Sequence, residues 1–117
     1  MGRSISATLA KALAYQLQRP AIVIAGEQAL HRLIPVALRD SGQSRVIGRL
    51  LLNLYDGSAY PFDLTELRLL DLELFEDSLR VLMLDYSPEV NVHERVPNGT
   101  AIWQRLIALW APAAVTK

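Results

Sequence analysis

The sequence predicts an all-α fold, or nearly so: a compact bundle of five or six helices in a single domain over residues 1–117. Apolar residues recur at spacings of three and four along most of the chain, which is the periodicity of an amphipathic helix. Capping and turn residues, among them Asp40, Asp63, Asp71 and Asn98, separate these periodic segments. The 117 residues are 51% hydrophobic, so one core can form without disulfides.

The N-terminal third predicts two helices with an ambiguous segment between them. Leucines recur every four residues up to residue 17, and Pro20 predicts the end of this helix, because proline disfavours a helical residue before it. This N-terminal helix, within residues 1–20, is expected to extend from a core over residues 28–110. A second helix is expected over residues 27–39, kinked one turn before Pro35.

A third helix is expected to begin at residues 40–43. Asp40 is predicted to cap the first-turn amides, while Gln43 reaches back to complete a capping box. Its leucine-rich face is expected to be buried. Arg45, Arg49 and Asn53 are spaced four residues apart and are expected to point outward.

The second half of the chain predicts three further helices. Asp63 opens a short helix to about residue 70, Asp71 caps the next, and residues 98–100 begin the last one. Two β-branched segments are the exception. A minor two-stranded pairing of residues 21–24 with residues 90–96 is therefore the alternative to a purely helical fold. In the helix after Asp71, one apolar stripe is expected to contain Leu72, Phe75, Leu79, Leu82 and Tyr86.

Charge is segregated along the chain. Residues 1–55 carry seven basic and two acidic residues. Residues 56–94 carry two basic and ten acidic residues, and residues 95–117 carry three basic residues. The neutral total argues against a generic polyanion-binding or membrane-surface protein. The opposite segments are expected to attract each other, either within one molecule or between two copies.

Catalytic and metal-binding motifs are missing from the sequence. Cysteine is absent, which excludes disulfides, a thiol nucleophile and cysteine-ligated metals. His31 and His93 lack a second ligand at zinc-like spacing, and a site formed by Glu89, His93 and Glu94 is the weaker alternative to a solvated loop. We therefore expect no enzyme, no catalytic residue, no metal and no cofactor. No apolar run approaches the length of a membrane span, so a cytoplasmic location without membrane contact is expected.

A polar cluster lies around the start of the third predicted helix. Free amides at a helix N-terminus, with hydroxyls and arginines nearby, can hold a phosphate or a carboxylate. Capping by Asp40 is the favoured interpretation of the same residues. The arginines also allow contact with nucleic acid, although the spacing departs from that of a helix-turn-helix motif. The candidate anion or nucleic-acid contacts are Arg39, Ser41, Ser44, Arg45 and Arg49.

Two tryptophans and an acidic helix face are the candidates for binding a protein. Trp103 and Trp110 lie seven residues apart on one face of the last helix, and tryptophan is enriched at interface hot spots. Core packing is the favoured interpretation of both tryptophans. Glu73, Glu76 and Asp77 form the acidic face, for which a solvated surface is the simplest interpretation.

Several sequence blocks resemble a known family. They are Asp-Ser-Gly-Gln-Ser-Arg at 40–45, Leu-Leu-Leu-Asn-Leu-Tyr at 50–55, Phe-Asp-Leu-Thr-Glu-Leu at 62–67, Leu-Asp at 70–71, residues 89–93, Pro-Asn-Gly at 97–99 and Ile-Trp at 102–103. Over residues 28–110 they are similar to an uncharacterised bacterial domain-of-unknown-function family. That family is often encoded on plasmids and integrative conjugative elements.

The resemblance implies a small helical protein carried by mobile elements, and it brings no catalytic residues with it. It also raises the expectation of a role in element maintenance or interference with host defence. Together with the missing motifs, it predicts a non-catalytic protein-interaction module with a protein partner or a second copy of itself. A nucleic-acid-associated protein that uses Arg39, Arg45 and Arg49 is the alternative.

Overall fold

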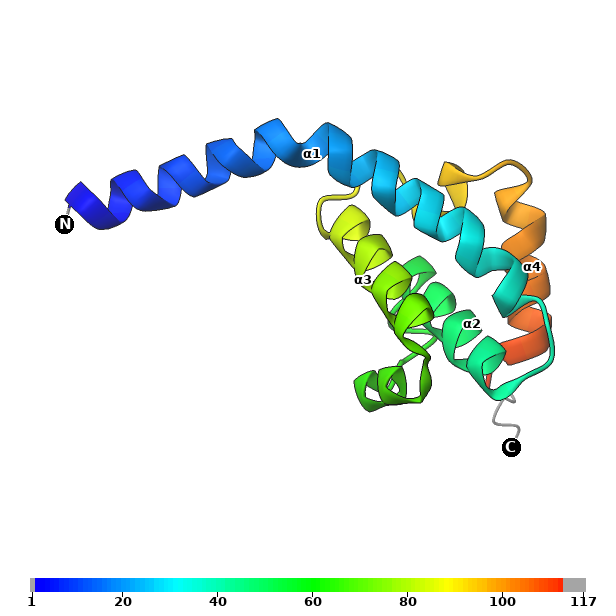
Figure 1. Ribbon diagram of the computed structural model, residues 1–117. Coiled ribbons are helices and arrows are strands. Elements are labelled where there is room, and N and C mark those ends of the chain that lie inside the picture. The colour runs from blue at the N-terminus through cyan, green and yellow to red at the C-terminus, as the bar shows by residue number, and fades with distance from the viewer. Residues whose placement is uncertain (1, 113–117) are drawn as a thin grey trace.

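The structure, a computed structural model, describes residues 2–112, with side chains from residue 6 onward. The prediction of an all-α fold is confirmed (Figure 1). None of the described residues forms a strand, so the pairing of residues 21–24 with residues 90–96 is wrong. The elements in chain order are α1 (Gly2–Ala37), α2 (Gly42–Tyr55), the short 3-10 helix η1 (Leu64–Leu69), α3 (Leu72–Tyr86), the short 3-10 helix η2 (Val92–Arg95) and α4 (Gly99–Trp110).

Helix α1 continues through both of its prolines, so the predicted end before Pro20 is wrong. A proline removes one helical hydrogen bond and kinks a helix, but packing on neighbouring helices can compensate. Figure 1 shows α1 bending where its N-terminal part leaves the body of the molecule. Residues 21–24, ambiguous in the sequence, are helical because this stretch leads directly into the contact between α1 and α3.

That contact is unusually close at Gly26. A Cβ atom at this position would lie 2.5 Å from Cβ of Leu84 and 3.1 Å from the carbonyl oxygen of Arg80. Only glycine allows the two backbones to approach this far. The close approach holds the second half of α1 against α3, which crosses beneath it in Figure 1.

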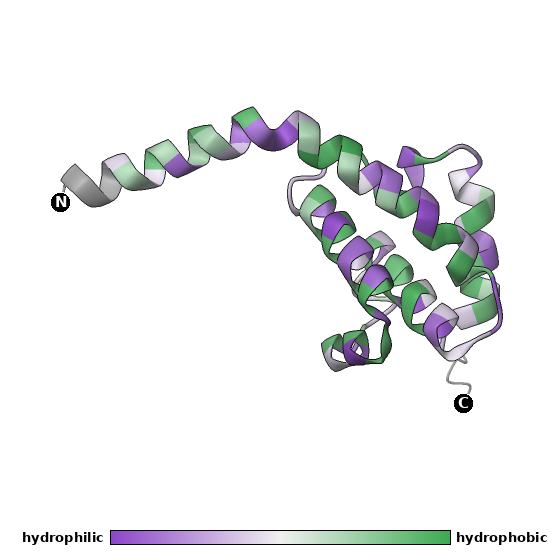
Figure 2. Cartoon of the chain, viewed as in Figure 1, coloured by the Kyte–Doolittle hydropathy of each residue, from purple (hydrophilic) through white to green (hydrophobic). Residues whose placement is uncertain are grey.

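Helix α2 lies at the centre of the core. It packs against α1 on one side and against α4 on the other, and side chains from most of its turns are buried. Figure 2 shows hydrophobic residues along α2 and along the second half of α1. The buried residues of α2 are Ser44, Val46, Ile47, Gly48, Leu50, Leu51 and Leu52.

The molecule is elongated, measuring 56 × 32 × 27 Å, because residues 2–18 of α1 project from the body (Figure 1). We call this segment the arm. Within the part of the chain that the structure describes, no helix is long and apolar enough to cross a membrane.

Candidate interaction surface

The arm presents a row of leucines to solvent. Leu9, Leu13 and Leu17 lie four residues apart and therefore share one face of the helix. Their exposed fractions are 58%, 53% and 84%. These three side chains form what we call the arm stripe. The four-residue spacing was visible in the sequence, but the sequence did not show that the rest of residues 2–112 leaves the stripe uncovered.

Helix α3 presents a second apolar surface, the α3 patch, formed by Leu72, Leu79, Met83 and Tyr86. All four are exposed, between 42% for Leu79 and 75% for Tyr86. The sequence grouped Leu72, Leu79 and Tyr86 with Phe75 and Leu82, yet only the last two are partly buried.

Helix α3 therefore packs through a face that is more polar than its sequence predicts. Its buried residues are Asp77, Ser78, Val81 and Leu84. The hydroxyl of Ser78 donates a hydrogen bond to the carbonyl oxygen of Leu74 at 2.8 Å, which satisfies it inside the core. The predicted apolar residues do share one side of α3, but Leu72, Leu79 and Tyr86 on that side are exposed to solvent.

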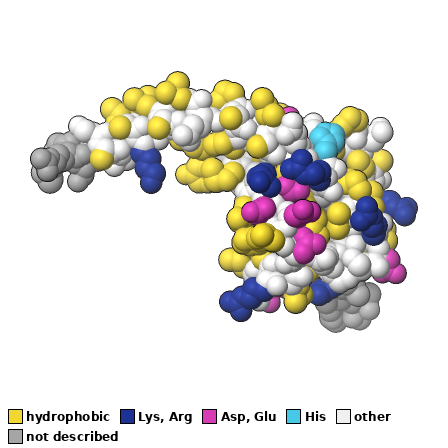
Figure 3. Space-filling view, in the orientation of Figure 1, with side chains coloured by type: hydrophobic (Ala, Val, Ile, Leu, Met, Phe, Trp, Pro, Cys, Tyr) yellow, Lys and Arg dark blue, Asp and Glu magenta, His cyan; other side chains and the backbone are white. Residues whose placement is uncertain are grey.

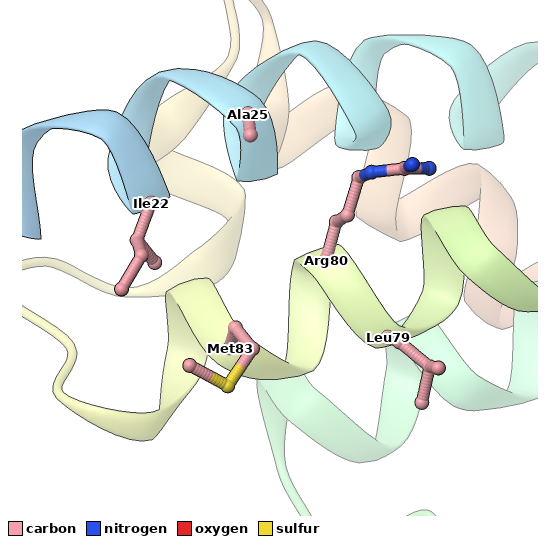
Figure 4. A pocket seen from close by; sticks show the side chains of 5 residues that line it. All are labelled: Ile22, Ala25, Leu79, Arg80 and Met83. Carbon is pink, nitrogen blue, oxygen red and sulfur yellow. The ribbon is translucent and has the colours of Figure 1, made fainter. Parts of the chain in front are cut away.

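Two open hollows lie along the junction of α1 and α3. The first, of about 200 Å³, is lined by Ile22, Ala25, Leu79, Arg80 and Met83 and is shown in Figure 4. The second, of about 640 Å³, lies between the arm and the C-terminal end of α3. Figure 3 shows hydrophobic side chains gathered where the arm meets the body. Met83 lines both hollows, so the α3 patch reaches the base of the arm, although no leucine of the arm stripe lines either hollow.

A single arginine fixes the arm to the end of α3. The guanidinium of Arg19 donates hydrogen bonds to the carbonyl oxygens of Leu84 (2.9 Å) and Ser87 (2.7 Å). It also forms an ion pair with Glu89 at 2.9 Å. These bonds satisfy carbonyls that a helix C-terminus leaves unpaired.

The same carboxylate binds a second arginine. Arg95 donates to Glu89 at 2.8 Å and also pairs with Glu27 of α1 at 3.2 Å. Hydrogen bonds from Arg19 and then from Arg95 lower the pKa of Glu89 to about 2. Neither Arg19 nor Glu89 was predicted in this role, because the bond joins residues 70 positions apart.

Among the predicted acidic interface residues, Asp77 has a structural role instead. Its side chain is buried and accepts hydrogen bonds from Arg32 at 2.8 Å and from Arg80 at 2.8 Å. The bonds from Arg32 lower the pKa of Asp77 below its ordinary range, and Arg80 adds to the effect. Glu73 and Glu76 are exposed, as expected of a solvated face.

The Asp77 cluster predicts an acid-sensitive contribution to stability. A carboxylate with a lowered folded-state pKa stabilises the fold above the unfolded pKa of about 3.9, and this contribution is lost as pH falls through the lowered value. Asp77→Asn is therefore expected to cost about 1–2 kcal/mol at pH 7 and progressively less below pH 4, since both arginines stay half exposed. Urea unfolding of the wild-type protein and of Asp77→Asn between pH 7 and pH 2 measures the difference in their free energies of unfolding.

The matched control is Glu76→Gln, which makes the same chemical change at an exposed neighbouring position. Its stability difference from the wild-type protein should be small and nearly independent of pH. A difference for Asp77→Asn that stays constant down to pH 2 would contradict the assignment.

The start of α2 is capped by a different residue from the one predicted. Ser41, not Asp40, is the N-cap: its Oγ atom accepts from the backbone N–H of Ser44 at 3.0 Å and lies 2.8 Å from the Ser44 hydroxyl. Gln43 does not complete a capping box, because its Oε1 atom accepts from the backbone N–H of Asp71 at 2.6 Å. Ser41 and Ser44 thus cap the helix rather than form an open anion site.

The predicted arginine face is interrupted. Arg39 is exposed in the connection between α1 and α2. Arg45 forms an ion pair with Glu66 at 3.2 Å, and Arg49 lines a small hollow beside Trp110 with its Nε atom buried. The outward direction predicted for Arg45 and Arg49 is wrong, because the segment between α2 and α3 covers this side of α2. Asn53 likewise donates to the carbonyl oxygen of Tyr60 at 2.9 Å.

Both tryptophans have structural roles. Trp103 is 1% exposed, and its Nε1 atom donates to the carbonyl oxygen of Leu51 at 3.1 Å, so it belongs to the core. Trp110 is partly buried and donates to the carbonyl oxygen of Ala37, at the end of α1, at 2.6 Å. It lies directly on Gly48, where any Cβ atom would overlap the indole ring. These positions fit the core interpretation of the tryptophan pair and not a docking edge.

His93 and its neighbouring acids do not converge on one site. The imidazole of His93 lies edge-on to Tyr55, with ring centroids 5.1 Å apart. Glu89 is bound by arginines, and Glu94 accepts from the backbone N–H of Asn91 at 2.9 Å. Among the described residues, no group of three or more His, Asp or Glu side chains is arranged to hold a metal ion.

The surface and the fold define an all-α domain with an uncovered apolar face, and comparison with known families gives its membership. Residues 27–111 match a family described as a family of unknown function (DUF7673). The chain belongs to this family. The match begins after the arm and includes α2, α3 and α4. Neither the curated proteins nor the solved structures contain a significant match.

Proposed function

We propose that this chain is a non-catalytic module that binds another protein through the arm stripe and the α3 patch. The observation that carries the proposal is the exposure of seven large apolar side chains on two adjoining helices. Exposed apolar patches mark interaction sites, and within each of the two surfaces the side chains share one face of their helix. A bound protein would remove this surface from water, and burial of apolar surface contributes about 25 cal/mol of favourable free energy per Å².

The isolated arm supports the same proposal. Most helical stability in proteins comes from packing of an apolar face, and the apolar face of the arm has no such packing among the described residues. All side chains from residue 6 to residue 14 are exposed. Lys11 is the only charged residue among them, so ion pairs along the helix do not stabilise it.

The charged residues favour binding over chemistry. Asp77 and Glu89 are held by arginines, and Asp63 and Asp71 cap helices. A general acid or base needs a carboxyl group placed toward a substrate pocket, and these carboxylates face structural partners. The ion pair between Arg45 and Glu66 disfavours the nucleic-acid alternative.

We further propose a setting for this binding, namely an accessory protein of a bacterial mobile element that acts in the cytoplasm. The resemblance of residues 28–110 to a family found on plasmids and integrative conjugative elements supports it. So does the preference for arginine, which supplies ten of the twelve basic residues and is typical of GC-rich genomes. Mapping the genomic neighbourhoods of family members tests the setting; a purely chromosomal housekeeping context would contradict it.

Site-specific photocrosslinking in the native host tests the binding surface. A photoreactive amino acid at Leu17 or at Met83 should give discrete adducts of one or a few defined masses. The control position is Arg105, which is exposed on α4, away from both surfaces. Adducts at Leu17 and Met83 but not at Arg105 are expected. No protein adduct at either apolar position, or equal adducts at all three, would contradict the proposal.

A further inference from the structure

The arm stripe faces away from the α3 helix of its own chain. Tyr15 contacts Tyr86 with ring centroids 6.0 Å apart, and Lys11 lines the hollow beside the same tyrosine. At about 100° per residue, Tyr15 and Lys11 each lie about 160° around the helix from Leu13. The side of the arm that meets its own α3 is therefore opposite the leucines.

The arm is also held in this direction. Arg19 binds the carbonyl oxygens at the end of α3, and Gly26 packs against Leu84 about two turns later. Turning the leucines inward would require rotating α1 about its axis and breaking both contacts. Residues 2–112 therefore leave the arm stripe open to a second molecule.

The area of the two apolar surfaces suits a stable interface between two proteins. A standard interface buries about 800 Å² on each partner. The arm stripe and the α3 patch together expose seven large side chains, on average about three fifths exposed. At on the order of 100 Å² each, they supply most of that area, whereas either surface alone supplies at most about half.

The two surfaces also match each other in length. At 1.5 Å per residue, the arm is about 25 Å long and α3 is about 22 Å long. The net charge of the whole chain is zero, so two copies do not repel each other.

We infer that the partner is a second copy of this chain, and that each arm stripe packs on the α3 patch of the other copy. This inference rests on the proposed function and names its partner. Reciprocal pairing uses both surfaces of both copies and closes with a two-fold axis, so neither surface remains to recruit a third copy. Lys11 lies away from the leucines, so its charge is not buried by the contact.

Light scattering over a range of concentrations tests the assembly. The wild-type chain should have twice its 13.0 kDa mass at micromolar concentration. Leu13→Glu and Leu79→Glu should each raise the dissociation constant at least about 100-fold, while circular dichroism shows an unchanged fold because both positions are exposed. The control Gln18→Glu makes the same charge change on the other side of the arm and should leave the dimer intact.

Disulfide trapping tests the arrangement, because the chain has no native cysteine. Leu13→Cys and Leu79→Cys are purified separately and mixed under mild oxidation. The mixture should form the Leu13→Cys/Leu79→Cys heterodimer in preference to either homodimer, since only the reciprocal arrangement brings these positions within disulfide distance.

Three outcomes overturn the inference. The first is a wild-type monomer at all concentrations, and the second is a dimer that survives both glutamate variants. The third is preferential trapping of the Leu13→Cys homodimer, which would mean that the arms pair with each other. If the chain is monomeric yet gives discrete photocrosslinks to a different protein, the second-copy inference fails while the proposed function stands.

Discussion

Replacing Trp103 with alanine is expected to lower the free energy of unfolding by about 3–5 kcal/mol. The indole is the largest fully buried side chain and fills the space between α2 and α4. Alanine would leave a cavity there and would remove the hydrogen bond to the carbonyl oxygen of Leu51. Urea unfolding followed by circular dichroism measures the loss as a lower midpoint at an unchanged slope.

Leu109→Ala is the control for this experiment. Leu109 lies on the same helix but is 41% exposed, so its truncation should cost less than about 1 kcal/mol. Comparable losses at both positions would contradict the assignment of Trp103 to the core and would reopen its role as a contact residue.

The second large effect is expected at Gly99, the first residue of α4. A Cβ atom at this position would overlap the backbone carbonyl oxygen of His93 in η2. A backbone atom cannot rotate away as a side chain can, so Gly99→Ala must push η2 and α4 apart. We expect a loss of about 3 kcal/mol or more in the free energy of unfolding, measured by urea or thermal unfolding.

Gly42→Ala provides the matched control, because it makes the same substitution at the first residue of another helix. A Cβ atom there meets no neighbouring atom within 4 Å. Alanine has the higher helix propensity, so this variant should be neutral or up to about 1 kcal/mol more stable. Equal destabilisation by the two variants would contradict the proposed close approach at Gly99.

The parts of the fold governed by local interactions were predictable from the sequence. Asp63 and Asp71 cap the helices that follow them, as expected, and the positions of α2, α3 and α4 were anticipated within a few residues. Caps act over three or four residues, so their signals are contained in the sequence around them. The exceptions are Asp40 and Asn98. Ser41, next to Asp40, is the N-cap of α2, and Asn98 precedes α4 with a left-handed backbone and forms no capping hydrogen bond through its side chain.

Interactions between distant segments account for the predictions that were wrong. Pro20 is a strong local signal for a helix end, but packing of α1 on α3 at Gly26 outweighs it. Arg45 was expected to be free, yet its partner, Glu66, lies 21 residues further along the chain. The candidate interaction surface could be predicted only in part. The spacing of the leucines identifies the arm stripe, whereas its exposure depends on how α1 is oriented on the folded body.

The contact made by Arg19 has a consequence for the boundaries of the domain. The family match begins at residue 27, eight positions after the arginine whose guanidinium satisfies the carbonyls of Leu84 and Ser87. A fragment cut at the limits of the match would lose this group and leave the end of α3 open to water. The region by which the family is recognised therefore leaves out part of the contact between α1 and α3, including the turn of α1 that carries Arg19.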